Sequence, residues 1–228
     1  PVYDIGFDAN GDLDTADLIS KAAGNDAFVR TWYDQSGNAK NAIQTTTSSQ
    51  PQIVNEGVII TQNSKPTIDF SINNFVALIE TTISLPQPYT ATTVQYYNVN
   101  SLDKYIFGQK PGSSFRSNIG KSKTTGKFFI HGGSNSGAVG DLLISRQYLT
   151  FALFNGADTE LSINSNNTQG ISAGTNPKDG LTIGNFKIPS NFSYQWEDNI
   201  REIVFWGSDQ SANRSGIEAN QNNFYSIY

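Results

Sequence analysis

The sequence predicts an all-β protein with a short helix near the N-terminus and a second helix at the C-terminus. Short runs rich in Val, Ile, Thr and aromatic residues recur at intervals of roughly ten residues, and clusters of Gly, Asn, Ser and Pro separate them. The 228 residues suit one large domain, and no internal repeat or long linker divides them. We therefore expect a single domain over residues 1–228, excised from a longer chain because the sequence starts at Pro1 and contains no Met.

Several segments have the composition of β-strands. Leu149, Phe151 and Leu153 alternate with Thr150 and Ala152, as in a strand with one buried face. Residues 155–158, Asn-Gly-Ala-Asp, tolerate positive φ and predict a hairpin to the next strand. Residues 203–206 are apolar on both faces, which predicts a central strand covered on both sides. The expected strands are residues 2–7, 27–33, 67–70, 91–98, 105–109, 127–131, 148–154, 159–164, 181–184 and 200–206.

Capping residues and helical spacing predict the two helices. Asp14 and Thr15 can cap a helix over residues 16–22, and Gly24 would end it. Near the C-terminus, one isoleucine and several polar and aromatic residues recur at helical spacing, and we expect this helix to pack its apolar side on the sheet. These residues are Ile217, Gln221, Phe224, Tyr225 and Tyr228.

Charge and composition exclude several functions. The formal net charge is −5, with 15 basic and 20 acidic side chains, which argues against nucleic acid as a partner. No apolar run approaches the roughly 18 residues of a membrane span, so we expect no membrane insertion. The absence of Cys excludes a disulfide framework, a Cys-ligated zinc site and thiol catalysis.

The carboxylates form no recognisable catalytic motif. Glycoside hydrolysis uses two carboxylates about 5–9.5 Å apart across a cleft. Glu197, Asp198 and Glu202 come nearest, but adjacent residues point to opposite faces of a strand. We expect these acids to be solubilising surface charge. A hydrolase remains an alternative if two of four candidate acids face a common cleft: Asp141, Glu160, Glu197 and Glu202.

Two further motifs have a structural and a functional interpretation. His131 lacks a second His or a Cys for a metal site, and the sequence has no G-x-S-x-G elbow for a catalytic triad, so a hydrogen-bonded histidine at a strand end is favoured. Asp8, Asn10 and Asp12 around Gly11 resemble the start of a calcium loop. A plain Asn-Gly turn is favoured there, so we expect no cofactor while Ca²⁺ stays an alternative.

Aromatic rings among many amides and hydroxyls point to sugar binding. Sugar rings stack on flat side chains, and sugar hydroxyls pair with amides and Arg. Tyr194 and Trp196 lie in a polar segment, where binding and structural roles are balanced, and one of Tyr96 and Tyr97 should be exposed. The expected binding residues are Tyr194, Trp196, Tyr97, Arg116, Gln109 and Asn118. The expected core aromatic residues are Trp32, Trp206, Phe151 and Phe205.

Three segments of the chain resemble a recurring block of the concanavalin A-like lectin/glucanase superfamily, in its LamG-like branch. They are residues 29–38 (Val-Arg-Thr-Trp-Tyr-Asp-Gln-Ser-Gly-Asn), 41–44 and 50–54. Residues 65–70, 149–155, 161–164 and 199–206 agree, so the resemblance covers nearly the whole chain. It implies a two-sheet antiparallel jelly-roll sandwich with ligand sites on the concave face or rim loops. Within the block, we expect Asp34, Ser36 and Asn38 to build a turn in which Gly37 supplies positive φ.

The same block resembles the catalytic sandwich of family 54 α-L-arabinofuranosidases. Chemistry in that family depends on a Cys-Cys strand motif followed by an acidic nucleophile. The matching residues 105–115 contain neither Cys nor a carboxylate, so no catalytic residue is carried over.

These observations favour a non-catalytic extracellular module for carbohydrate binding or adhesion, a lectin-like part of a secreted, cell-surface or virion protein with a polysaccharide or glycan as partner. Fold alone does not settle function, so two alternatives remain. One is a glycoside hydrolase with an unrecognised carboxylate pair. The other is a structural surface or virion assembly domain whose aromatic residues contact protein partners.

Overall fold

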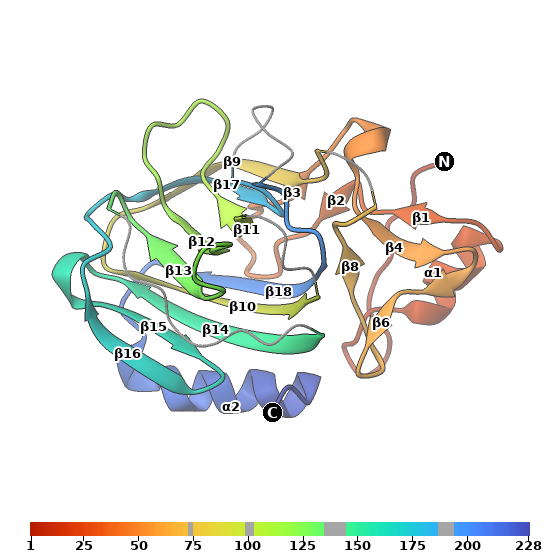
Figure 1. Cartoon of the computed structure of the whole chain (residues 1–228). Coiled ribbons are helices and arrows are strands. Elements are labelled where there is room, and N and C mark those ends of the chain that lie inside the picture. The colour runs from red at the N-terminus through yellow and green to blue at the C-terminus, as the bar shows by residue number, and fades with distance from the viewer. Residues whose placement is uncertain (73–74, 99–102, 135–144, 187–193) are drawn as a thin grey trace.

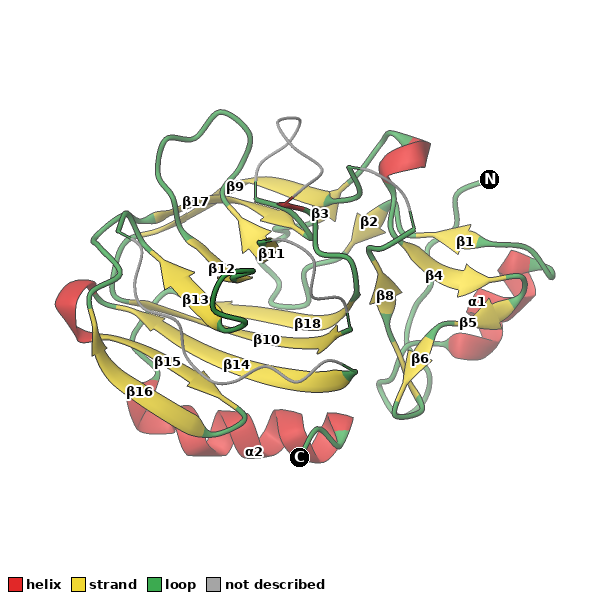
Figure 2. Cartoon of the chain, viewed as in Figure 1, coloured by secondary structure: helices red, strands yellow, loops and turns green. Residues whose placement is uncertain are grey.

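Two antiparallel β-sheets lie face to face across an apolar core, and helix α2 (Arg214–Tyr225) covers the outer side of the larger sheet (Figure 1). The computed structural model describes residues 1–72, 75–98, 103–134, 145–186 and 194–228. The predicted all-β sandwich with a helix near each end is confirmed. Figure 2 shows how strands dominate the molecule.

Within the described residues, the larger sheet has nine strands and the smaller sheet has seven. The larger sheet runs in the order β1 (Ala27–Phe28), β4 (Gln52–Asn55), β8 (Ile68–Asp69), β18 (Asn199–Trp206), β10 (Tyr89–Tyr97), β14 (Arg146–Phe154), β15 (Thr159–Ile163) and β16 (Asn166–Ile171), with β5 (Val58–Ile59) paired to β4. The smaller sheet runs β13 (Phe128–His131), β12 (Asn118–Lys121), β11 (Lys104–Gly108), β17 (Lys178–Ile183), β9 (Leu78–Leu85), β3 (Ala42–Ile43) and β2 (Thr31–Trp32). A separate hairpin joins β6 (Thr61–Gln62) to β7 (Lys65–Pro66).

Aromatic contacts across the core hold the two sheets together. Phe107 of β11 meets Phe205 of β18 with ring centroids 5.1 Å apart, and Phe128 of β13 meets Tyr148 of β14 at 5.4 Å. Both contacts are edge-to-face, the arrangement that aromatic quadrupoles favour. The expected core position of Phe205 is thereby confirmed.

The central strands of the larger sheet are covered on both sides. Phe151 pairs with Thr92 of β10, and the hydroxyl of Thr92 accepts a hydrogen bond from Gln221 of α2. Leu149 and Leu153 lie on the same face as Phe151, and all three are buried. Thr150 and Ala152 on the opposite face are also fully buried. The expectation of one exposed face on this strand is therefore wrong, because the core covers the face of Ala152 and α2 covers the face of Phe151.

Helix α1 (Thr15–Ala22) follows the predicted capping pattern. The Asp14 carboxylate accepts a hydrogen bond from the backbone N–H of Asp17 at 2.9 Å, and Ala23 and Gly24 follow with positive φ. Leu18 and Ala22 pack with Val54 in a small second cluster. Neither described helix has the length and apolar composition that crossing a membrane requires.

Helix α2 buries a polar face, contrary to expectation. Its buried residues are Glu218 and Gln221, whereas Phe224 is 45% exposed. Glu218 accepts a hydrogen bond from the Ser162 hydroxyl of β15 at 2.7 Å. The sheet beneath the helix offers the hydroxyls of Thr92 and Ser162 as partners, so hydrogen bonds join apolar contacts in docking α2.

The strand predictions succeed where residues are β-branched or aromatic. The hairpin at residues 155–158 joins β14 to β15 as predicted, and Gly156 has φ +55°. Residues 2–7 form no strand beyond an isolated bridge between Phe7 and Leu13. The sequence misses several strands, among them β9, β12 and β16, and Asn and Gly, which are depleted in strands, make up half or more of β12 and β16.

The turn at residues 34–38 forms as predicted. The Asp34 carboxylate accepts hydrogen bonds from the Ser36 N–H at 2.9 Å and the Lys40 N–H at 3.0 Å. The Ser36 hydroxyl accepts from the side-chain amide of Asn38 at 2.9 Å, and Gly37 has φ +84°. These side chains serve the turn itself, and Trp32 before them packs partly buried against the core, as expected.

Candidate functional site

Strands β11, β12 and β13 present a mixed aromatic and polar surface on the outer face of the smaller sheet. Asn118 pairs with His131, and Gly120 pairs with both Phe129 and Tyr105. Directly paired residues share a face, and alternation along each strand gives all five the same face. Ile119 and Ile130, the alternate positions, belong to the core.

Four aromatic rings gather on this outer face. Tyr105 contacts Phe129, Phe186 and Tyr194 with ring centroids 5.2, 4.8 and 5.6 Å away. The backbone of Phe186 crosses so close to Gly108 that a Cβ at that glycine would lie 2.0 Å from the Phe186 carbonyl oxygen. Glycine at 108 is therefore required for this crossing. Tyr194 and Tyr105 are half-buried and keep part of their rings accessible.

Polar groups lie among these rings. The exposed Arg116 places its guanidinium carbon 5.2 Å from the Phe186 ring centroid, a cation–π contact. Asn118 is fully buried, and neither of its amide atoms has a hydrogen-bond partner among the residues described. Most buried polar groups are paired, so an amide with both ends free is unusual.

His131 ends β13 and is hydrogen-bonded, as predicted. Its Nδ1 accepts a hydrogen bond from the Gly133 N–H at 3.1 Å, so neutral His131 carries its proton on Nε2 and can donate it. Burial, together with the nearby charge of Arg116, lowers the pKa of His131. The side chain is therefore neutral at pH 7.

The structure brings Arg116, Asn118 and Tyr194 of the predicted set onto one face, together with His131, which the sequence did not favour as a binding residue. We call Tyr105, Arg116, Asn118, His131, Phe186 and Tyr194 the outer-face cluster. Gln109 follows β11 and is buried, and its side-chain oxygen has no hydrogen-bond partner among the described residues.

The predicted exposure of Trp196 and Tyr97 is wrong. These residues are 1% and 2% exposed, and their ring centroids lie 6.1 Å apart in the core. The backbone N–H of Trp196 donates a hydrogen bond to the Gly184 carbonyl at 2.8 Å, and this bond holds the chain at Trp196 against the core. Neighbouring Gln195 is buried too, donating to the Phe70 carbonyl at 2.6 Å. The polar composition around Trp196 therefore did not indicate an exposed loop. Because the rings of Trp196 and Tyr97 are buried, neither can stack on a ligand.

The candidate catalytic acids lie on separate elements with separate partners. Glu160 pairs with Arg214 at 3.7 Å, Glu197 pairs with Lys104 at 2.6 Å, and Glu202 accepts from Gln221 at 2.9 Å. Strands β15 and β18, which carry Glu160 and Glu202, are separated by β14 and β10, a span of about 14 Å. That exceeds the separation used by glycosidases. Asp141 lies outside the described residues.

The segment from Asp8 to Asp12 has the hydrogen bonds of a turn. The Asp8 carboxylate accepts from the backbone N–H of Asn10 at 2.8 Å and of Asp12 at 3.0 Å, and these bonds lower the pKa of Asp8. Asp12 pairs with Lys65 at 3.3 Å. Within the described residues, no group of three or more His, Cys, Asp or Glu side chains could hold a metal ion. Ca²⁺ there stays the alternative to the favoured plain turn.

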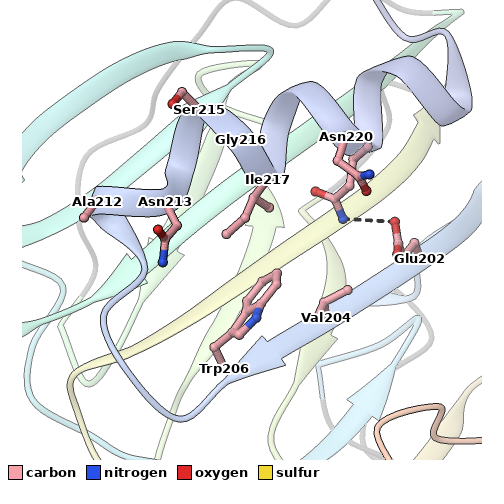
Figure 3. Close-up of a pocket in the computed structure, with 10 residues that line it drawn as sticks. Glu202, Val204, Trp206, Ala212, Asn213, Ser215, Gly216, Ile217 and Asn220 are labelled. Atoms are coloured by element: carbon pink, nitrogen blue, oxygen red, sulfur yellow. Dashed lines mark hydrogen bonds between the residues drawn. The ribbon is translucent and has the colours of Figure 1, made fainter.

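A groove lies between β18 and α2, with a volume of about 550 Å³ (Figure 3). Trp206 of β18 lines it and is half-buried, so its expected place in the core is wrong. Phe205, one residue earlier, takes the core position instead, because alternation turns Trp206 to the α2 side. This difference was predictable from the sequence, because neighbouring residues of a strand point to opposite faces and only one of Phe205 and Trp206 can face the core.

Comparison with solved structures defines the fold class. The chain is similar to a family 54 α-L-arabinofuranosidase, a Glu-to-Gln variant soaked with 4-nitrophenyl α-L-arabinofuranoside, with TM-score 0.67 and 12% identity over 94% of this chain and 55% of that one. It is also similar to the Trypanosoma rangeli sialidase in complex with sialic acid, with TM-score 0.57 and 8% identity over 86% of this chain and 32% of that one. The class is an antiparallel β-sandwich found in glycosidases.

A third similar structure is a putative carbohydrate binding protein from Bacteroides ovatus, with TM-score 0.52 and 14% identity over 72% of this chain and 53% of that one. This chain therefore spans between about a third and just over half of the proteins it resembles. No family model matches the chain, and no curated protein matches it. At these identities the likeness shows the fold alone.

Proposed function

We propose that this chain is a carbohydrate-binding module of the concanavalin A-like type, which holds a glycan at the outer-face cluster without cleaving it. The observation that carries the proposal is the pair of half-buried rings of Tyr105 and Tyr194, with centroids 5.6 Å apart, on the same face as the exposed guanidinium of Arg116. The Asn118 amide on the same face is fully buried and has no partner among the described residues, and an unmade buried hydrogen bond costs about 1–3 kcal/mol.

The chemistry of the cluster suits a sugar. Tyr105 and Tyr194 offer partly accessible rings for stacking on sugar C–H bonds, and Arg116 offers guanidinium donors. Burial raises the pKa of Tyr105 to about 12, so its hydroxyl keeps its proton and can donate. His131 donates from Nε2. These groups match the hydroxyls and apolar patches of a sugar ring.

Binding is better supported than cleavage. The similar arabinofuranosidase and sialidase structures are hydrolases by name, which keeps a glycosidase as the alternative. However, Glu197 pairs with Lys104, and the described cluster contains no carboxylate. The proposal includes an extracellular, cell-surface or virion setting, where glycans are displayed, and an adhesive role through multivalent display.

Isothermal titration calorimetry with neutral and anionic oligosaccharides tests the proposal. Arg116→Ala should weaken binding about tenfold, a loss of about 1.4 kcal/mol, because it removes guanidinium donors and frees the Phe186 ring. Arg30→Ala is the matched control, since Arg30 is also exposed but precedes β2 at the far edge of the smaller sheet.

Unchanged affinity in Arg116→Ala, or a wild-type protein that binds no oligosaccharide, would contradict the proposal. Release of reducing sugar from a polysaccharide by the wild type would favour the hydrolase instead. Arg30→Ala should bind as the wild type does and melt at a similar temperature.

A further inference from the structure

The groove between β18 and α2 has two regular walls. Glu202, Val204 and Trp206 alternate along β18 and so share one face of the larger sheet. The facing wall comes from α2 and its preceding turn, where Asn213, Ile217, Asn220 and Gln221 recur at helical spacing. Figure 3 shows Trp206 and Ile217 facing each other across the space. The volume of about 550 Å³ lies within the usual range of ligand pockets, about 300–1,000 Å³.

Helix α2 is tied to β18 by the Gln221–Glu202 hydrogen bond, whereas its first turns are anchored over β15. Glu218 accepts from Ser162 of β15 at 2.7 Å, and Arg214 pairs with Glu160 of β15 at 3.7 Å. Strand β15 lies on the far side of β10 and β14 from β18. The helix therefore leaves Val204 and Trp206 only half-buried. An accessible indole is the best aromatic surface for stacking.

An unpartnered acceptor faces this space. Gln221 is 5% exposed, and its amide nitrogen donates to Thr92 Oγ1 and to Glu202 Oε2, each at 2.9 Å. Those two bonds use both of its N–H groups. Its side-chain oxygen has no hydrogen-bond partner in the described part of the chain. The dashed line to Glu202 in Figure 3 marks the second of these bonds.

The polar lining selects against anions. Among the described residues that line the groove, Glu202 is the one ionisable side chain, and no Lys or Arg accompanies it. Burial raises the pKa of Glu202. A carboxyl group and an amide oxygen both accept hydrogen bonds from hydroxyls, whereas an anionic ligand would meet no positive partner here.

We propose that this groove is a second saccharide site, which binds one uncharged sugar unit with its ring on Trp206 and its hydroxyls donating to Gln221 Oε1 and Glu202. Asn213, Asn220 and Ser215 at the rim supply further hydrogen-bonding groups. The inference deepens the proposed function by adding a site on the opposite side of the sandwich and by naming its ligand class.

Gly216 provides a variant that blocks the groove without harming the fold. It lines the groove from within α2, and no atom lies within 4 Å of where its Cβ would be. Leucine at this position should fill the space, and alanine should leave it open. Both residues are better helix formers than glycine, so neither variant should melt below the wild type.

Calorimetric titration with neutral trisaccharides should give two sites per wild-type chain. Gly216→Leu and Trp206→Ala should each leave one site, whereas the control Gly216→Ala should keep two. In the Arg116→Ala background, the remaining site should vanish with Gly216→Leu and persist with Gly216→Ala. The groove should not bind sialyllactose, so any affinity of the wild type for sialyllactose should be unchanged in Gly216→Leu.

One site in the wild type that Arg116→Ala weakens and Gly216→Leu leaves unchanged would overturn the groove proposal while the proposed function stands. Loss of all binding in Gly216→Leu, with Arg116→Ala unaffected, would support the groove and overturn the outer-face site. Sialyllactose binding that Gly216→Leu abolishes would overturn the uncharged ligand class. No binding of any trisaccharide would overturn both proposals.

Discussion

Asn118 occupies a buried position where an apolar side chain would give a more stable fold. Its β12 neighbours Ile119 and Lys121 are also fully buried, but Lys121 has a cation–π contact with Tyr97 at 5.3 Å, whereas the Asn118 amide has no partner among the described residues. Natural proteins hold such groups mostly at functional sites, where stability is sacrificed for activity.

Asn118→Leu should therefore stabilise the protein and weaken glycan binding. Leucine has a similar shape without polar atoms, so removing the unpaired amide should raise the free energy of unfolding by about 1–2 kcal/mol. Urea denaturation and titration with oligosaccharides measure the two effects. A less stable Asn118→Leu protein would mean that the amide is satisfied in solution.

His131 should make the stability of the protein depend on pH. Its folded pKa is lowered, first by burial and then by Arg116, so the unfolded chain, with a histidine pKa of about 6.5, binds the proton more readily than the folded one. The stabilisation is present above that pH and is lost as the pH falls below it.

Urea midpoints between pH 7 and pH 5.5 measure this dependence. The wild type should lose more stability over this interval than His131→Asn, which cannot titrate. Glu202 is unchanged in both proteins, so its raised pKa, which acts in the opposite direction, cancels in the comparison. Parallel curves for the two proteins would contradict the assignment.

At the scale of elements, helix α2 shows how polar residues can dock a helix. The Glu218 carboxylate receives the Ser162 hydroxyl at 2.7 Å and the Ser165 hydroxyl at 3.2 Å, and Arg214 lies 3.7 Å away. Glu218→Ala would leave buried Ser162 without this acceptor.

We expect Glu218→Ala to lower the free energy of unfolding by about 2 kcal/mol, because hydrogen bonds to charged groups contribute about 1.5–3 kcal/mol. Chemical denaturation measures the loss, and Glu218→Gln should recover part of it. Asn223→Ala, at an exposed position of the same helix, is the control and should change little. A stable Glu218→Ala protein would mean that apolar contacts of α2 dominate its docking.

Local signals in the sequence predicted helices and turns better than they predicted which side chains are buried. Capping by Asp14, the turn at Asp34 and the hairpin at residues 155–158 depend on neighbouring residues, so the sequence contains all the required information. The burial of Trp196 and the exposure of Trp206 depend on partners far along the chain, namely Gly184 and α2. Composition could not reveal those partners.

At the scale of the molecule, the two-layer sandwich followed from a resemblance rather than from periodicity. Alternating patterns fail in strands buried on both faces, as at Leu149 and Thr150 of β14. The outer-face cluster was half predictable. Arg116, Asn118 and Tyr194 were expected as ligand residues, while Tyr105, His131 and Phe186 join them only through the pairing of β11, β12 and β13 and the chain crossing at Gly108.

The layered architecture has a mechanical consequence. The outer-face cluster lies on the smaller sheet, and the Trp206 groove lies beyond the larger one, so the two proposed sites face away from each other with the core between them. A single copy that occupies both would hold one polysaccharide strand on each side, tying neighbouring strands into a mesh. Even weak sites then give durable attachment, because many copies bind along each strand and a strand released by one copy is still held by the others.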